Sequence, residues 1–186
     1  MDISDASFRR RMAIEDELLS LLQEVPYEKI SVLDIAQRQN IARKTFYRYF
    51  PNKQACLEGL MDRLIYECNI RILRRTDRQN DERWQYEDWL EFWMDHQQLL
   101  SAVVRDRLDY LLVQRLAIYT MQEEAFAMKR LHTKKILCDE DVLVFYLSGQ
   151  VALLLKWSGE GFSRPVKEMV DKLMRLNYEP LLSPIP

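Results

Sequence analysis

The chain has 186 residues, 48% of them hydrophobic, which is enough to bury a substantial core in one large domain or in a small domain plus a larger one. It carries 27 Lys and Arg against 29 Asp and Glu, and this formal charge of −2 argues against general coating of nucleic acid. Only four glycines and six prolines occur, so long helices are favoured over a sheet with many turns. We therefore expect an all-α fold.

The first segment predicts an amphipathic helix that ends near Val25 and Pro26, because proline disfavours helical geometry in the residue before it. Three arginines, residues 9–11, precede its apolar stripe and are either a solvated helix start or an arm that reaches phosphates. The stripe has helical spacing and consists of Ile14, Leu18, Leu21, Leu22 and Val25.

The segment from Ser31 to Lys53 predicts two short helices joined by a tight turn and followed by a third. Ser31 is a good N-cap, and Asp34 stands three residues later, where its carboxylate favours the amide-rich end of the helix. This helix should end at Gln39 or Asn40, because Asn tolerates the left-handed conformation that a tight turn needs. The second helix should begin at about Ala42.

At 100° per residue, the second helix has an apolar face and a cationic face. The apolar side consists of Ala42, Phe46, Tyr49 and Phe50. The other side consists of Arg43, Lys44, Tyr47 and Arg48. Such cations can reach phosphates and the guanine acceptors of the major groove together, which predicts DNA binding. The alternative is a solvated basic surface on an ordinary helix pair.

The third helix should begin at Lys53, after Pro51 ends the second helix and Asn52 supplies an N-cap. A cation in a first helical turn opposes the helix dipole, so the position of Lys53 makes more sense if a DNA phosphate is bound there. The alternative is a freely solvated Lys53.

These residues resemble the DNA-binding domain of the TetR family of transcriptional regulators, in the run Asp34-Ile35-Ala36, then Ile41, then Thr45 to Lys53 (TFYRYFPNK). The resemblance implies a helix-turn-helix head over residues 1–53 and a helical ligand-binding and dimerisation domain over 54–186. It also implies a homodimer on a palindromic operator in double-stranded DNA.

By position, the resemblance assigns contacts with the DNA backbone to Thr45, Tyr47 and Lys53, and base or phosphate contacts to Arg43, Lys44 and Arg48. The sequence departs from the family pattern at three positions. Asn40 and Lys44 stand where glycine is usual, and Ala42 stands where Ser or Thr usually caps the recognition helix. The missing cap removes a hydroxyl that would serve the helix terminus, and Lys44 adds charge in compensation.

Beyond Lys53 the pattern predicts helix almost throughout, with a connector helix to about residue 75, a polar break at 77–81 and a further helix over 108–131. Residues 83–98 are rich in aromatic side chains, which are either plain core or the walls of a pocket for a small-molecule effector. The candidate pocket residues are Trp89, Phe92, Trp93, Tyr110 and Tyr119.

After a polar turn over 133–141, the helix from Val142 is apolar on nearly every side and therefore needs partners on both sides. A single small domain could wrap it, but a dimer interface formed with the final helix meets this need with less chain. The candidate interface residues are Phe145, Gly149, Ala152, Leu153, Val170 and Leu173.

Other classes of protein fit less well. The sequence contains no Gly-rich phosphate loop, HExxH or GxSxG, and its two histidines are far apart, so we expect neither an enzyme nor a metal or cofactor site. Three cysteines without a CxxC, and no apolar signal peptide, favour a reducing cytoplasm. The longest apolar run, residues 142–157, is interrupted by polar residues and is short for a membrane span, so we expect no membrane association.

The sequence therefore predicts a sequence-specific DNA-binding regulator, a ligand-responsive dimeric repressor of the TetR type. The alternative is a helix-turn-helix co-activator or interaction module that a protein partner controls. Trp157-x-Gly159 followed by Pro165 resembles the C-terminal pattern of a bacterial subgroup that includes such co-activators.

Overall fold

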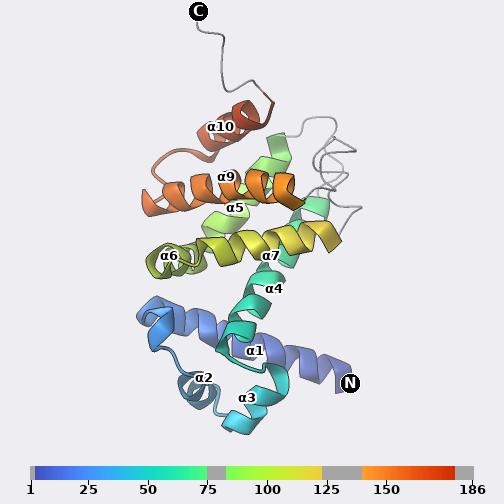
Figure 1. The fold of residues 1–186 in the computed structure, drawn as a ribbon, viewed down its shortest axis with the longest axis vertical. Coiled ribbons are helices and arrows are strands. Elements are labelled where there is room, and N and C mark those ends of the chain that lie inside the picture. The colour runs from blue at the N-terminus through green and yellow to red at the C-terminus, as the bar shows by residue number, and fades with distance from the viewer. Residues whose placement is uncertain (1–2, 75–82, 123–139, 179–186) are drawn as a thin grey trace, which may run out of the picture.

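The computed structural model describes residues 3–74, 83–122 and 140–178, and every regular element in these ranges is a helix. The expected all-α fold is therefore confirmed. The helices are stacked along the long axis of the molecule, with α2 and α3 at one end and α10 at the other (Figure 1).

Helix α1 (Ile3–Glu24) ends immediately before Val25 and Pro26, as their sequence predicts. Its apolar stripe is buried against α4 and against α2, with Val25 partly buried. A 3₁₀ turn, η1 (Tyr27–Lys29), then leads into α2 (Val32–Arg38). This turn was not anticipated from the sequence.

Helix α2 has the predicted N-cap, in the form of a complete capping box. The Asp34 amide donates to Ser31 Oγ at 3.2 Å, and the Ser31 amide donates to Asp34 Oδ2 at 2.7 Å. The helix ends at Gln39, and Asn40 has a φ of 51°, the left-handed conformation expected of it. The turn thereby sets the direction of α3 (Arg43–Tyr49).

Helix α4 (Lys53–Arg74) begins where predicted, with the Ala55 amide donating to Asn52 Oδ1 at 2.8 Å. Adjacent residues in its middle form ion pairs in opposite directions. Arg63 pairs with Glu15 and Asp16 of α1, whereas Asp62 pairs with Arg115 of α7. The helix therefore links the N-terminal helices to the rest of the molecule.

The body contains α5 (Arg83–Asp95), α6 (Gln97–Asp106), α7 (Asp109–Gln122), α9 (Glu140–Gly159) and α10 (Val166–Tyr178). A break at His96, not anticipated from the sequence, separates α5 from α6. The predicted helix over 108–131 is seen as far as Gln122, and the predicted polar break at 77–81 lies outside the described residues. Most of the predicted turn over 133–141 also lies outside them, and α9 already begins at Glu140.

One described helix segment, Asp141–Gly159, is long and apolar enough to cross a membrane by length and composition. A core helix of a soluble protein satisfies the same criterion, so a single such segment is weak evidence for a membrane span. Here the helix packs along α7 and against α6 (Figure 1).

The buried ion pair between α1 and α4 leads to a prediction about stability. The Glu15 side chain is only 3% exposed, and burial raises its pKa although Arg63 and Arg11 oppose the rise. Replacing Arg63 with Met would leave a buried carboxylate with less compensation. We expect Arg63→Met to lower the free energy of unfolding by about 3 kcal/mol near neutral pH, measured by urea denaturation.

The loss should depend on pH. Without Arg63 the pKa of Glu15 rises further, and an acid with a raised pKa in the folded state destabilises the fold as pH increases through that value. The loss should therefore be smaller at about pH 5 than at about pH 8. Adding Glu15→Gln should restore stability at the higher pH, and an equal loss at both pH values would contradict this account.

Candidate DNA-binding surface

Helix α3 is held by its apolar side and presents its cationic side to solvent. Phe46 and Phe50 are buried in the core, and their rings lie 5.8 Å apart. The predicted cationic side is exposed and consists of Arg43, Lys44, Tyr47 and Arg48. Ala42 differs from the prediction, because it is exposed rather than packed in the core. Its place just before the helix, as the N-cap residue, accounts for this.

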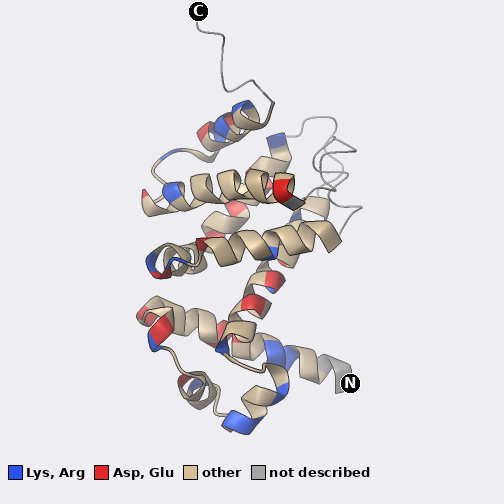
Figure 2. Cartoon of the chain, in the orientation of Figure 1, with Lys and Arg blue, Asp and Glu red and all other residues tan. Residues whose placement is uncertain are grey.

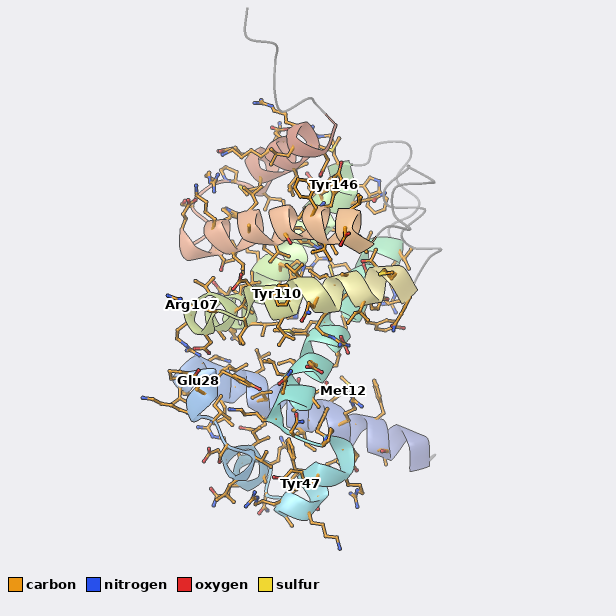
Figure 3. All side chains as sticks on the ribbon, viewed as in Figure 1. Met12, Glu28, Tyr47, Arg107, Tyr110 and Tyr146 are labelled. Atoms are coloured by element: carbon orange, nitrogen blue, oxygen red, sulfur yellow. The ribbon has the colours of Figure 1, made fainter. Side chains whose placement is uncertain are left out.

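Tyrosine side chains hold two of these cations. Arg43 Nη2 donates to Tyr47 Oη at 3.2 Å, and Arg48 Nη2 donates to Tyr49 Oη at 3.2 Å. Each guanidinium also lies over the ring of its tyrosine, 5.8 Å and 5.0 Å from the centroid respectively. Figure 3 shows Tyr47 at the end of the molecule, and Figure 2 shows Lys and Arg at this end of α3.

The N-terminus of α3 has no side-chain cap, as the alanine at position 42 predicts. The Thr45 amide donates to the Ala42 carbonyl oxygen at 2.7 Å, and Thr45 itself is half-buried. Ile41 and Thr45 therefore bracket a turn that packing and backbone hydrogen bonds hold, with the Ile41 amide donating to the Ala36 carbonyl at 2.9 Å.

Lys53, for which the sequence predicts a phosphate contact, forms hydrogen bonds within the chain. Its ammonium donates to the carbonyl oxygens of Tyr27 at 2.6 Å and Ile30 at 2.7 Å, and lies 4.1 Å from the centroid of the Tyr27 ring. Burial lowers the pKa of Lys53, while the charges of Glu28 and Asp34 oppose this change. The cation in the first turn of α4 therefore ties η1 to the start of α4.

The arginines at 9–11 belong to α1 rather than to an arm that precedes a helix. Arg9 and Arg10 are exposed. Arg11 instead donates through Nε to Glu15 Oε1 at 3.2 Å, and its guanidinium lies 4.7 Å from the Phe50 centroid. Arg11 thus contributes to packing between α1 and the end of α3.

The C-terminus of α6 is bonded directly to the end of α1 and to η1. The Tyr27 amide donates to Asp106 Oδ2 at 2.9 Å, and Arg105 Nη2 donates to the carbonyl oxygens of Leu22 at 2.9 Å and Val25 at 3.1 Å. Helix α1 has no basic residue in its own last turn, so Arg105 supplies the cation that its C-terminus favours.

Arg105 and Asp106 also pair with each other through two hydrogen bonds, of 2.9 Å and 2.8 Å. The bond from Arg105 is the main reason that the pKa of Asp106 lies below its usual range, and the Tyr27 amide adds to it. Tyr27 is thus held on both sides: its N–H by α6, and its carbonyl by Lys53 of α4. No local signal in the sequence marks this joint, because its residues are about 80 positions apart.

The structure does not bring the five predicted effector residues together in one cavity. Trp89, Phe92 and Trp93 are buried in the core, although the Trp93 indole N–H has no acceptor in the described part of the chain. Tyr110 lines a groove of about 570 Å³ between α7 and α9. Tyr119 lines a separate cavity of about 500 Å³ between α1, α4 and α7.

The six predicted interface residues also separate into two groups. Phe145, Gly149 and Ala152 are exposed on α9, and Leu153 is partly exposed. Val170 and Leu173 are instead buried within the chain, where α10 packs on α5. Their apolar spacing indicates a buried face but cannot tell which helix covers it, and here a helix of the same chain does so.

The fold and this surface define a class of protein: a helix-turn-helix DNA-binding head joined to an all-helical body. Residues 15–60 match the family described as bacterial regulatory proteins, tetR family. A similar protein is the HTH-type transcriptional regulator EthR of Mycobacterium tuberculosis, 33% identical over 99 residues, which are 50% of this chain and 46% of that protein. The HTH-type transcriptional repressor KstR of Mycolicibacterium smegmatis is 35% identical over 75 residues, 40% of this chain and 35% of the repressor.

Solved structures extend the similarity in fold to nearly the whole chain. The fatty acid degradation regulator FadR of Bacillus halodurans has a TM-score of 0.64 at 16% identity, covering 92% of this chain and 96% of that one. The TetR-like regulator LfrR of Mycobacterium smegmatis has a TM-score of 0.58 at 17% identity, covering 97% and 99%.

Residues 15–60 thus match the TetR family of bacterial regulatory proteins, and the solved structures show that the rest of the chain shares the same fold. The sequence match spans about half the length of the EthR protein, and it includes the N-terminal helices described above. The relatives that match are described as transcriptional regulators, which agrees with the expectation that this chain is not an enzyme.

The bonds of Lys53 predict how a variant should behave. Lys53→Met leaves two carbonyl oxygens without their cation, so we expect the free energy of unfolding to fall by about 1 to 2 kcal/mol in urea denaturation. The dependence of DNA affinity on salt should stay unchanged, measured with a duplex of random sequence. A salt slope reduced by about one would instead show that Lys53 contacts a phosphate.

The joint between α6 and η1 should be visible in hydrogen exchange. Asp106→Ala removes the acceptor of the Tyr27 amide, so we expect this amide to exchange at least tenfold faster, measured by NMR. Lys172→Ala, which removes a partner from an exposed ion pair on α10, is the control and should leave the Tyr27 amide unchanged. Equal protection of Tyr27 in the wild type and Asp106→Ala would contradict the joint.

Proposed function

We propose that this protein is a cytoplasmic, sequence-specific DNA-binding repressor that acts as a homodimer and responds to a small-molecule effector. The observation that carries the proposal is the side of α3 that presents Arg43, Lys44 and Arg48 together while two phenylalanines anchor the opposite side. A rigid short helix with clustered cations suits the major groove, where Arg and Lys bind guanine acceptors and neighbouring phosphates. The match of residues 15–60 to a family of bacterial regulatory proteins supports the same function.

A homodimer would give the protein two such helices. A two-fold dimer reads a palindrome when its recognition helices are about 34 to 36 Å apart, one turn of DNA. The exposed apolar residues of α9 support self-association, because a soluble monomer gains nothing from presenting them to water. A change in the angle between head and body would alter the spacing of the two heads and release the DNA.

The cavity between α1, α4 and α7 supports the response to an effector. Its walls include Glu15 and Arg63, which pair α1 with α4, and Asp62 and Arg115, which pair α4 with α7. A small molecule in this cavity would contact the head and the body at once. Binding that favours one arrangement of these ion pairs would shift the position of the head.

A second candidate is a DNA-binding module that a protein partner controls. It is favoured by the filled aromatic core around Trp93 and by the apolar side chains that remain exposed on the body. The two candidates share the head and differ in what releases the DNA. A small molecule that lowers operator affinity of the purified protein alone would support the repressor and contradict partner control.

The DNA-binding function is tested by selecting bound duplexes from a random pool. We expect a palindrome to be enriched, and Arg43→Ala/Lys44→Ala to weaken binding to it by at least tenfold with a smaller dependence on salt. The matched control is Lys172→Ala/Arg175→Ala, which removes two cations from α10 at the opposite end of the molecule (Figure 1). No enriched sequence, or equal affinities of the two variants, would overturn the proposed surface.

A further inference from the structure

Helix α9 presents a continuous stripe of six residues, of which five are exposed and the sixth, Val142, is partly exposed. The stripe is spaced by three, four, three, four and three residues, the pattern of a helix that packs along another helix. Phe145 is 76% exposed, and Gly149 and Gly159 have open space where a Cβ would lie. The stripe consists of Val142, Phe145, Gly149, Ala152, Lys156 and Gly159.

A groove lies beside the C-terminal half of this stripe. Its volume is about 570 Å³, and Ala152, Lys156 and Gly159 form one wall. The facing wall includes Tyr110, which is 66% exposed, and Val104. The α9 residues that line the groove run from Ser148 to Gly159, with Tyr110 below the helix, whereas Tyr146, the neighbour of Phe145, lies towards its start (Figure 3). One helix therefore carries a protruding aromatic ring towards one end and an open apolar groove at the other.

We propose that the occupant of this groove is Phe145 of a second copy of the chain, with the two α9 helices antiparallel and crossing where Gly149 of each copy faces Ala152 of the other. This arrangement rests on the proposed homodimer and specifies its register. It places Phe145 of each copy opposite Lys156 of the other, and Val142 opposite Gly159. Both grooves are filled, since the two-fold axis repeats each contact.

The sizes and charges along the stripe favour antiparallel over parallel pairing. The intervals between the stripe residues are the same from either end of the helix. In an antiparallel pair, each stripe residue of one copy therefore faces a stripe residue of the other copy. The small residues Gly149 and Ala152 meet at the crossing, and the Lys156 ammonium can lie over the ring of Phe145 while its stem packs in the groove. Parallel pairing would instead place Lys156 against Lys156, two like charges in a partly desolvated interface.

The orientation of α9 in the fold supports the same arrangement independently. Helix α9 lies across the long axis of the molecule, and the α3 surface lies at one end of that axis (Figure 1). A two-fold axis parallel to the long axis reverses the direction of α9 and keeps both α3 surfaces at the same end. The antiparallel pairing is therefore the one that leaves both heads able to meet a single DNA duplex.

Cysteine substitution tests the register. Positions 145 and 156 lie about 17 Å apart along one helix, whereas a disulfide needs Cα atoms within about 7 Å, so the two cannot join within one chain. The variants are Phe145→Cys, Lys156→Cys and the double variant, each with Cys138→Ser. The other native cysteines, Cys56 and Cys68, are buried.

On mild oxidation we expect the double variant to form a covalent dimer on non-reducing gels, and each single variant to remain uncrosslinked. An equal mixture of the two single variants should also give covalent dimer after subunit exchange. Crosslinking of Phe145→Cys alone would show parallel pairing and overturn the proposal. A double variant that sediments as a dimer but does not crosslink would also overturn the proposed register. The proposed homodimer itself would still stand.

A second variant tests the crossing point without an added thiol. Gly149→Leu fits the single chain, because nothing lies within 4 Å of the added Cβ, but it would hold the two helices apart. We expect at least a tenfold weaker dimer by sedimentation with an unchanged helical circular dichroism spectrum. Gln37→Leu, at an exposed site in the head, is the control. Equal dimer affinity of both variants would overturn the crossing point, and a wild-type protein that sediments as a monomer would overturn the homodimer as well.

Discussion

The position of helix α3 depends on hydrogen bonds to the backbone of Tyr27. These bonds link Tyr27 to α6 of the body on one side and to the start of α4 on the other. Asp106 accepts the Tyr27 N–H, and Lys53 donates to the Tyr27 carbonyl. Lys53 follows the end of α3 by only four residues. A displacement of α6 can therefore be transmitted to α3 through Asp106, the Tyr27 backbone and Lys53. Rigid contacts of this kind transmit small displacements, since packed helices move as units.

Helix α4 adds a second constraint through its paired charges. Arg63 and Asp62 are neighbours in the chain, and they direct one ion pair towards α1 and one towards α7. Burying the Glu15 carboxylate costs free energy that packing alone would not require, as the raised pKa of this group indicates. The benefit is geometric, because charged partners accept fewer relative positions than apolar surfaces do. The cavity beside these pairs is therefore well placed to influence the angle between head and body.

Helix α9 is covered on only one side by the other described helices. One side of it packs along α7 and α6, and the other presents Phe145, Gly149 and Ala152 to solvent. A dimer built on this side would use the helix that lies across the molecule and leave the head free. Dimerisation and DNA binding would then use separate surfaces, at different positions along the long axis of the molecule. Structures with 16 to 17% identity share this fold, so the arrangement of helices tolerates extensive change in side chains.

Local features of this protein can be predicted from neighbouring residues alone: the capping box at Ser31, the left-handed turn at Asn40, the uncapped start of α3, and the two sides of that helix. Each of these depends on residues within one or two helical turns of one another, so spacing alone reveals them. The packing of distant segments instead sets the contacts of Lys53 with η1, the joint of Arg105 and Asp106 with Tyr27, and the burial of Val170 and Leu173 within the chain, where α10 packs on α5. A pattern in sequence specifies that a side chain is apolar or charged. It does not specify which distant group meets that side chain, because that choice is made when all helices compete for the same buried surface.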